Sequence, residues 1–223
     1  MGRLGLIAGS TIRGSEPVSG EDWVVLQRHR LDRYALPHRI DHEANVIRLL
    51  DEGCDRILAI GSVGGLRPEL GPGTLLCPDD FIALTAAPAP SSFDDERAHR
   101  VPRFDLEWRR RVLEAWRTAG VEVVDGGVYW QTRGPRLETR AEIRLIASHA
   151  HVVGMTLASE WAMADELGAP YAAVCVVDNL ANGVSERELA MEELESGRRE
   201  NAARVSEALS RVLPVLADSQ GGP

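Results

Sequence analysis

The most constraining feature of the sequence is an apolar run at residues 171–177, which is rich in valine and ends at the polar pair Asp178-Asn179. A short apolar run of this composition is typical of a buried β-strand, and it is the best candidate for a central strand in the chain. The two polar residues at its end are harder to explain by packing. The run therefore predicts a largely buried sheet with polar groups where a central strand ends.

Shorter runs of the same kind alternate with helical patterns along the chain. The further predicted strands are residues 4–8, 24–26, 56–60, 74–77, 121–131 and 152–154. The predicted helices are 42–52 after an N-cap at Asp41, 106–119, 138–148, 157–167 and, as one or two segments, 185–216. Glycines at 61–65 are expected to break the strand before them, and residues 86–103 form the long predicted loop. This alternation predicts one α/β domain with a mixed central sheet flanked by helices, over residues 1–218, followed by a disordered tail at 219–223.

Composition narrows the class of protein. With 25 basic and 34 acidic residues the net charge is −9, which disfavours non-specific binding to nucleic acid or to a membrane surface. The three cysteines are widely separated in apolar surroundings, so neither a disulfide framework nor a metal site is indicated. The N-terminal apolar run is too short for a signal peptide, and nothing approaches a membrane span of about 20 residues. These features predict a cytoplasmic protein without a metal.

Polar or glycine-rich motifs follow the predicted strands at residues 9–11, 28–30, 61–65, 132–138 and 178–183. In α/β folds, sites form at strand ends. A hydroxyl and free amides near Ser10, and the guanidinium and imidazole of Arg28 and His29, are suited to an anion. Taken singly, each motif has a plainer interpretation: an ordinary turn, a solvated strand end, or for Glu138 an acid favoured in the first turn of a helix.

Taken together and in this order, the motifs resemble the family of trimeric purine nucleoside phosphorylases and methylthioadenosine phosphorylases. The resemblance covers roughly residues 3–183. Its most specific stretches are 61–73 with the downstream Pro78-Asp79-Asp80-Phe81-Ile82, then 134–142 and 154–160. It implies a nucleoside phosphorylase-like fold.

The resemblance also implies the roles of individual residues. Inorganic phosphate, the co-substrate, would be bound by Ser10, Arg28, His29, the backbone of Gly61 and Ser62, and Thr156. The nucleoside would contact Met155 under the ribose, and Leu137, Glu138, Asn179 and Ala181 around the base; Glu138, Asn179 and His29 would be catalytic. Phe93 and His99 would complete the 5′ pocket of a neighbouring subunit, so a homotrimer is expected. No metal and no organic cofactor is implied.

The residues at the base positions favour a 6-oxopurine. Hypoxanthine and guanine carry N1–H, a donor that suits an ionised Glu138, whereas N1 of adenine is an acceptor. The adenine-preferring members of the family have Asp at the position of Asn179 and a second Asp at the position of Ala181. We therefore expect phosphorolysis of inosine, guanosine or 5′-methylthioinosine, with the 5′ substituent left open. The alternatives are a hydrolytic purine nucleosidase and a catalytically weakened purine-binding protein.

The sequence departs from the family pattern at several positions. Only 17 residues separate Ser10 from Arg28, where the family usually has a considerably longer insert. Leu137 replaces a usual Phe, Asp178 a usual Thr, and Ser159 a usual Pro before Glu160; Arg133 precedes Gly134 where Glu or a small residue is common. The sequence alone assigns no role to Asp178 or Glu160.

Overall fold

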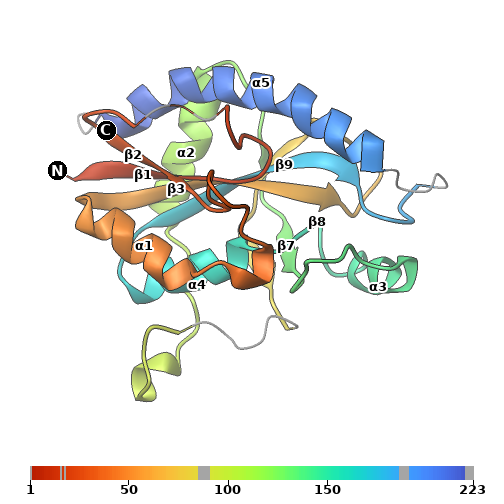
Figure 1. The fold of residues 1–223 in the computed structure, drawn as a ribbon, viewed down its shortest axis with the longest axis horizontal. Helices are drawn as coiled ribbons and strands as arrows, with labels where there is room; N and C mark the ends of the chain where they lie inside the picture. Colours follow the sequence, from red (N-terminus) through yellow and green to blue (C-terminus); the bar gives the residue numbers. More distant parts are fainter. Residues whose placement is uncertain (1, 16, 18, 85–90, 186–190, 219–223) are drawn as a thin grey trace.

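A mixed sheet runs through the centre of the protein (Figure 1). The structure is a computed structural model that describes residues 2–15, 17, 19–84, 91–185 and 191–218. The strand order is β5-β7-β8-β3-β9-β4-β6, with β1 also paired to β3 and β2 paired to β1. The strands are β1 (Arg3–Ala8), β2 (Trp23–Gln27), β3 (Cys54–Gly65), β4 (Leu75–Cys77), β5 (Asp80–Ile82), β6 (Val124–Asp125), β7 (Val128–Gln131), β8 (Val152–Gly154) and β9 (Tyr171–Leu180).

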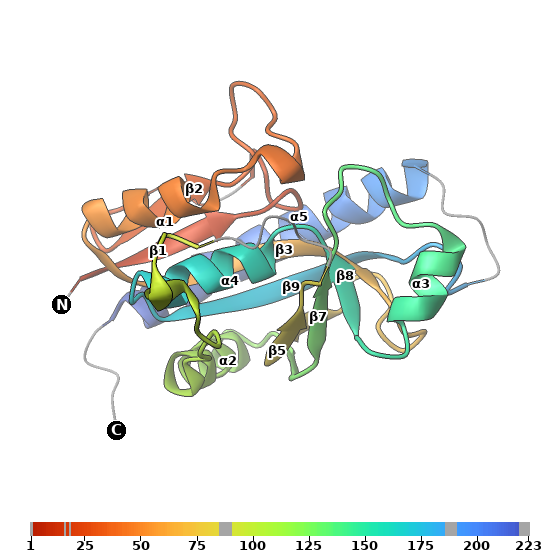
Figure 2. The same ribbon diagram turned by 90° about the horizontal axis from the view of Figure 1, so that it is seen from below.

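Helices cover both faces of this sheet, which confirms the predicted α/β class. The helices are α1 (His42–Asp51), α2 (Leu106–Thr118), α3 (Arg140–Ile146), α4 (Leu157–Glu166) and α5 (Met191–Ala217), with short 3-10 turns at Pro37–Arg39 and Glu96–Ala98. Helices α1 and α4 lie on one face and α2 and α5 on the other, while α3 packs beyond β7 and β8 (Figures 1 and 2). Within the described part of the chain, no helix is both long and apolar enough to cross a membrane.

The centre of the sheet is well packed because β3 and β9 are buried on both faces. Ile57 and Ala59 pack toward α1 and α4, whereas Leu58 and Ile60 pack toward α2 and α5. Each buried aliphatic side chain of this size contributes about 1.5–3 kcal/mol of hydrophobic stabilisation. The polar residues that follow these strands are therefore held on a well-packed support.

Two strands continue further than the sequence predicted. The glycines at 61–65 do not break β3, because Gly64 and Gly65 pair with β8 on one side and β9 on the other. Strand β9 likewise runs beyond Val177 to Leu180. Tertiary pairing overrides the weak strand propensity of glycine here. The region 121–131 instead divides into β6 and β7 at Gly126 and Gly127, whose φ angles are +97° and +121°.

The helix predicted from Glu138 begins two residues later. Thr139 is its N-cap and forms a capping box with Glu142, so Glu138 lies outside the helix. The C-terminal pattern forms a single helix over its described part, α5, and the predicted tail at 219–223 lies outside the described residues. Within the predicted loop 86–103, residues 86–90 also lie outside them.

A short connection joins β1 to the parallel strand β2 and brings Arg28 beside the end of β1. The backbone N–H of Arg28 donates to the carbonyl of Ala8 at 3.2 Å. Gly9 is required at this point, because a Cβ there would lie 2.3 Å from the Ile60 carbonyl oxygen and 2.6 Å from Nη1 of Arg28. The 17-residue spacing therefore still places Ser10 and Arg28 together.

Candidate active site

A cavity of about 280 Å³ lies where several strands end. Ten residues that the sequence analysis singled out line it: Ser10, Arg28, His29, Ser62, Leu137, Glu138, Met155, Thr156, Asn179 and Ala181. They come from six separate segments that span most of the chain. The fold thus brings together most of the predicted site.

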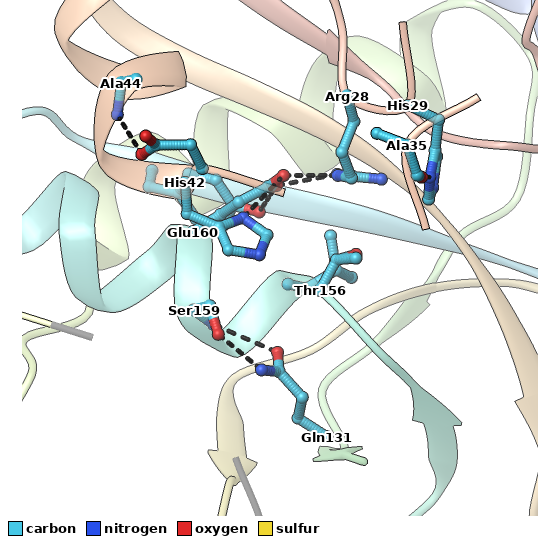
Figure 3. Close-up of polar contacts among 12 residues, drawn as sticks. Arg28, His29, Ala35, His42, Ala44, Gln131, Thr156, Ser159 and Glu160 are labelled. Carbon is cyan, nitrogen blue, oxygen red and sulfur yellow. Dashed lines mark hydrogen bonds and ion pairs between the residues drawn. The ribbon is translucent and has the colours of Figure 1, made fainter. Parts of the chain in front are cut away.

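Arg28 is held in a fully buried ion pair with Glu160 (Figure 3). Its Nε and Nη2 donate to the two carboxylate oxygens, the latter at 2.7 Å, and Nη1 donates to the Ile60 carbonyl at 3.0 Å. Burial alone would lower the pKa of Arg28, but the charge of Glu160 outweighs it and raises that pKa. Burial likewise opposes ionisation of Glu160, yet the charge of Arg28 lowers its pKa to about 2. Both groups are therefore charged at neutral pH.

Further contacts fix the carboxylate of Glu160. The hydroxyl of Tyr171 donates to its Oε2 at 3.0 Å, and Nδ1 of His42 lies 3.7 Å from its Oε1. Glu160 thus has a structural partner that the sequence did not reveal, because it lies 132 residues from Arg28. The guanidinium is oriented before any ligand binds, and two of its five N–H groups make no contact with Glu160 or Ile60.

His29 is a neutral imidazole rather than a cation. Its Nδ1 lies 2.8 Å from the Ala35 carbonyl, which can only accept, so Nδ1 carries the proton and Nε2 is left with a lone pair. The ring stacks on Tyr34, with centroids 4.9 Å apart. Burial and the nearby charge of Arg28 lower the pKa of His29 to about 4, although the hydrogen bond to Ala35 opposes this. At neutral pH, Nε2 is an acceptor for a protonated oxygen.

Two hydroxyls at the cavity have different surroundings. Thr156 is the N-cap of α4 but its side chain does not cap the helix, because the amide of Ser159, the third helical residue, donates to Oε1 of Gln131 at 3.1 Å instead. The Thr156 and Leu157 amides donate to the hydroxyl of Tyr129 at 3.1 and 3.3 Å. The Thr156 hydroxyl is therefore available at the positive end of a helix dipole. Ser62 instead donates to Oδ2 of Asp178 at 2.5 Å.

Asp178 organises the wall behind Ser62. Besides Ser62, its Oδ2 accepts from the hydroxyl of Thr11 at 2.8 Å, and its Oδ1 accepts from the amide of Asn201 at 2.9 Å. These partners come from the loop after β1, from β3 and from α5. The carboxylate that replaces the family's usual Thr therefore ties three segments of the cavity wall together.

The other part of the cavity carries an acceptor and an amide. The carboxylate of Glu138 accepts from the hydroxyl of Thr132 at 2.6 Å, which fixes its orientation. Nδ2 of Asn179 donates to the adjacent Leu180 carbonyl at 2.7 Å. Gly134, at a φ of +61°, allows its loop to pack on Met155, whose sulfur would lie 2.4 Å from a Cβ. The amide donor of Asn179 and the carboxylate acceptor of Glu138 thus line the same part of the cavity as the thioether of Met155.

Three predicted residues do not line the cavity. Gly61 pairs with Cys175 inside the sheet, and a Cβ there would meet Leu157. Phe93 lies under the guanidinium of Arg97, at 4.3 Å, and His99 is exposed. Their predicted role in a neighbouring subunit stays a prediction.

The structure also explains Ser159 and adds residues that the sequence analysis missed. Ser159 exchanges hydrogen bonds with Gln131 of β7, at 2.5 and 3.1 Å (Figure 3). Tyr34, Asn182 and Arg198 also line the cavity. No sequence signal marked Arg198, which lies within a long helical pattern. Among the described residues, no group of three or more His, Cys, Asp or Glu is placed to hold a metal ion.

Comparison with known proteins gives consistent results. A sequence model described as the phosphorylase superfamily matches residues 11–214. A protein of Archaeoglobus fulgidus named probable 6-oxopurine nucleoside phosphorylase is 41% identical over 200 residues, which cover 87% of this chain and 82% of the relative. A protein of Pseudomonas syringae pv. tomato named probable S-methyl-5′-thioinosine phosphorylase is 35% identical, again over 87% and 82%.

Solved structures agree on the fold. The methylthioadenosine phosphorylase of Schistosoma mansoni in complex with adenine superposes with a TM-score of 0.81 and 24% identity. The match covers 97% of this chain and 92% of that one.

Proposed function

This chain belongs to the phosphorylase superfamily, and from that premise we propose that it catalyses the phosphorolysis of 6-oxopurine nucleosides. The relatives named as 6-oxopurine nucleoside and S-methyl-5′-thioinosine phosphorylases, at 41% and 35% identity, support this activity. It is a pentosyltransferase reaction. A phosphate oxygen bonds to C1′ of the sugar while the C1′–N9 bond breaks, which yields the free purine and ribose 1-phosphate or its 5-methylthio form. Inosine, guanosine and 5′-methylthioinosine are the candidate substrates.

The observation that carries the proposal is the composition of one cavity. Groups suited to an anion, among them Arg28, His29 and Thr156, line the same cavity as Glu138 and Asn179. Phosphorolysis needs an anion binder and a purine binder within one small space, because the reacting atoms must approach to about 3–3.5 Å. Hydrolysis would need no anion binder, since water is the nucleophile.

Selectivity for the base follows from hydrogen-bond complementarity. Glu138, oriented by Thr132, accepts from N1–H of a 6-oxopurine. The amide of Asn179 donates to N7 or O6, where negative charge develops as the base departs. Adenine presents a lone pair at N1, so the carboxylate of Glu138 would face another acceptor.

The bound phosphate supplies negative charge to the reaction, and His29 accepts a hydrogen bond from the proton that hydrogenphosphate carries. The sugar gains oxocarbenium character as the bond breaks, and the bound phosphate anion beside it stabilises that charge. Neutral His29 accepts from the O–H of hydrogenphosphate through Nε2, which keeps the unprotonated oxygens for attack and for Arg28. The proton of hydrogenphosphate balances the reaction by ending on the departing purine. Inorganic phosphate is the co-substrate, and no metal or organic cofactor enters the proposal.

A substrate panel tests the proposal. Inosine, guanosine, adenosine and their 5′-methylthio forms would be assayed with and without phosphate. We expect turnover that depends on phosphate and a preference for 6-oxopurines of at least roughly 100-fold in kcat/KM. Turnover without phosphate would identify a hydrolytic nucleosidase, and hypoxanthine binding without turnover at any phosphate concentration would identify a purine-binding protein. The preferred 5′ substituent would come from the same panel.

Variants at the base positions connect the selectivity to named residues. Asn179→Asp replaces a donor by an acceptor when ionised, so inosine turnover falls and adenosine is relatively favoured, by on the order of 100-fold in the ratio of kcat/KM values. Glu138→Gln also reduces inosine turnover. Because both residues contact one base, the double variant should not show additive effects. An inosine-to-adenosine ratio that stays constant in both variants would contradict the assignment.

The assembly and location of the enzyme are further parts of the proposal. We propose a cytoplasmic homotrimer in which Phe93 and His99 of one subunit complete the 5′ pocket of the next, as the family resemblance implies. Light scattering should give about three subunits, and Phe93→Ala should raise the KM for the nucleoside without changing that for phosphate. A fully active monomer would remove both residues from the site.

A further inference from the structure

Helix α5 brings an arginine to the cavity that neither the sequence motifs nor the family resemblance assigned. Arg198 lines the cavity, and its side chain is 37% exposed. The helix is held close to β9 at this point, because a Cβ on Gly197 would lie 2.3 Å from the Asp178 carbonyl oxygen. Asn201, one turn further on, donates to the carbonyl of Val177 at 3.2 Å. The backbone that carries Arg198 is therefore well anchored.

The guanidinium of Arg198 is not committed to a protein partner. Its Nε lies 3.7 Å from Oδ2 of Asp178, which is an ion-pair distance but too long for a hydrogen bond. That Nε is buried and makes no hydrogen bond within the described part of the chain. Asp178 does not need this arginine, since Thr11, Ser62 and Asn201 already donate to it. An anion can therefore take the guanidinium without leaving a buried carboxylate unpaired.

The position of Arg198 is at the phosphate side of the cavity. It approaches the oxygen of Asp178 that also accepts from Ser62, a predicted phosphate-binding residue. It also lies close enough to His29 for its positive charge to help lower the pKa of that imidazole.

The other charged groups at this side of the cavity supply no uncompensated positive charge for an anion. Arg28 is neutralised by Glu160, and His29 is uncharged at neutral pH because its pKa is about 4. Asp178 adds a buried carboxylate that would repel phosphate. Of the two arginines among the described residues that line the cavity, Arg28 already donates three hydrogen bonds to Glu160 and Ile60, whereas the buried Nε of Arg198 donates none.

We propose that Arg198 binds the phosphate co-substrate directly, as a second arginine beside Arg28. This proposal rests on the proposed phosphorolysis and deepens it. A guanidinium matches phosphate with two parallel N–H···O bonds, and a swing away from a contact at 3.7 Å sacrifices little. Arg198 thus supplies the positive charge that the Arg28–Glu160 pair does not.

The test compares two adjacent arginines of α5. Arg198→Ala should raise the KM for phosphate roughly 10- to 100-fold, as expected for the loss of a charged hydrogen bond, and leave the KM for the nucleoside within about twofold. Arg198→Lys should recover part of the loss. Arg199→Ala is the matched control, because it removes the same charge from the next, exposed residue and should change neither constant. Thermal melts of all variants confirm that they fold.

Direct titration of phosphate into the nucleoside-free protein separates this proposal from the proposed function. Weaker binding in Arg198→Ala than in Arg199→Ala supports the role even if wild type turns over no nucleoside, an outcome that would refute only the phosphorolysis. Equal phosphate affinity and equal phosphate KM in the two variants would overturn the role of Arg198. A rise in the nucleoside KM alone would overturn it too, since it would place the guanidinium at the sugar.

Discussion

The cavity contains two arginines that each approach a buried carboxylate, and the two pairs differ in burial and in geometry. Arg28 and Glu160 are both almost completely inaccessible and joined by two hydrogen bonds. Arg198 is 37% exposed and lies 3.7 Å from an Asp178 that has other donors. The buried pair is a fixed part of the framework, whereas the open pair can exchange its partner. An arginine beside a carboxylate is thus a fixed structural contact in one place and, in our proposal, a ligand-binding group in the other.

The largest expected effect comes from breaking the buried pair. Glu160→Gln leaves the Arg28 guanidinium buried without a counter-charge, and this should reduce the free energy of unfolding by about 3–5 kcal/mol. Urea denaturation at pH 7 measures it. A loss below about 1 kcal/mol would mean that the pair is no more structural than a surface ion pair.

Removing the carboxylate of the open pair should have an intermediate effect. Asp178→Ala leaves the donors on Thr11, Ser62 and Asn201 without their acceptor, at a cost of about 2–3 kcal/mol. The same urea titration tests this, and Asp178→Asn, which keeps one carbonyl oxygen, should lose less. If both variants were as stable as wild type, Asp178 would not organise the wall of the cavity.

Lowering the pH should destabilise the folded protein much more through His29 than through the Arg28–Glu160 pair. The folded-state pKa of His29, about 4, lies below its unfolded value of about 6.5, so the unfolded chain binds a proton first as the pH falls. Between pH 7 and pH 5 this reduces the free energy of unfolding by up to about 2 kcal/mol. Glu160, with a pKa of about 2, stays ionised in the folded protein, and because an unfolded Glu begins to bind a proton only near pH 5, it contributes only about 0.2 kcal/mol over that range.

Urea titrations at pH 7, 6 and 5 measure this pH dependence. His29→Gln should flatten it, whereas His151, whose pKa burial also lowers, contributes equally to wild type and variant. An identical slope in the two proteins would show that His29 is not held neutral.

The smallest expected effect on stability belongs to Arg198. Arg198→Ala should change the free energy of unfolding by less than about 1 kcal/mol, because the ion pair is loose and the side chain partly solvated. Arg198→Ala should therefore raise the phosphate KM strongly with little loss of stability, whereas Glu160→Gln should lose much stability. A loss comparable to that of Glu160→Gln would erase the distinction between the two pairs.

Local sequence was sufficient for the residues whose motifs are continuous. Arg28 and His29 follow one strand, and Met155 and Thr156 another, so each pair could be placed at a strand end. Their meeting in one cavity could not be predicted in this way, because β8 runs antiparallel to β3 and pairs with its last residues, Gly64 and Gly65. Burial of residues 171–177 was also predictable, since the run is uniformly apolar.

Residues that act through partners far along the chain were not predictable in this way. The pairing of Arg28 with Glu160, and of Asp178 with Arg198, depends on how α4 and α5 pack, which no local pattern encodes. The extension of β3 through Gly64 and Gly65 has the same origin, because two neighbouring strands supply the hydrogen bonds that glycine propensity argues against.

Gly9 has a consequence for how sequences of this kind can diverge. Any side chain at residue 9 would collide with the Ile60 carbonyl and with the guanidinium of Arg28. Residue 9 can therefore acquire a larger amino acid only in a lineage where β1 and β3 separate and Arg28 is also lost or redirected. Glycine at 9, arginine at 28 and glutamate at 160 should covary in alignments as one inherited unit, which serves as a marker of the buried ion pair in sequences that have no structure.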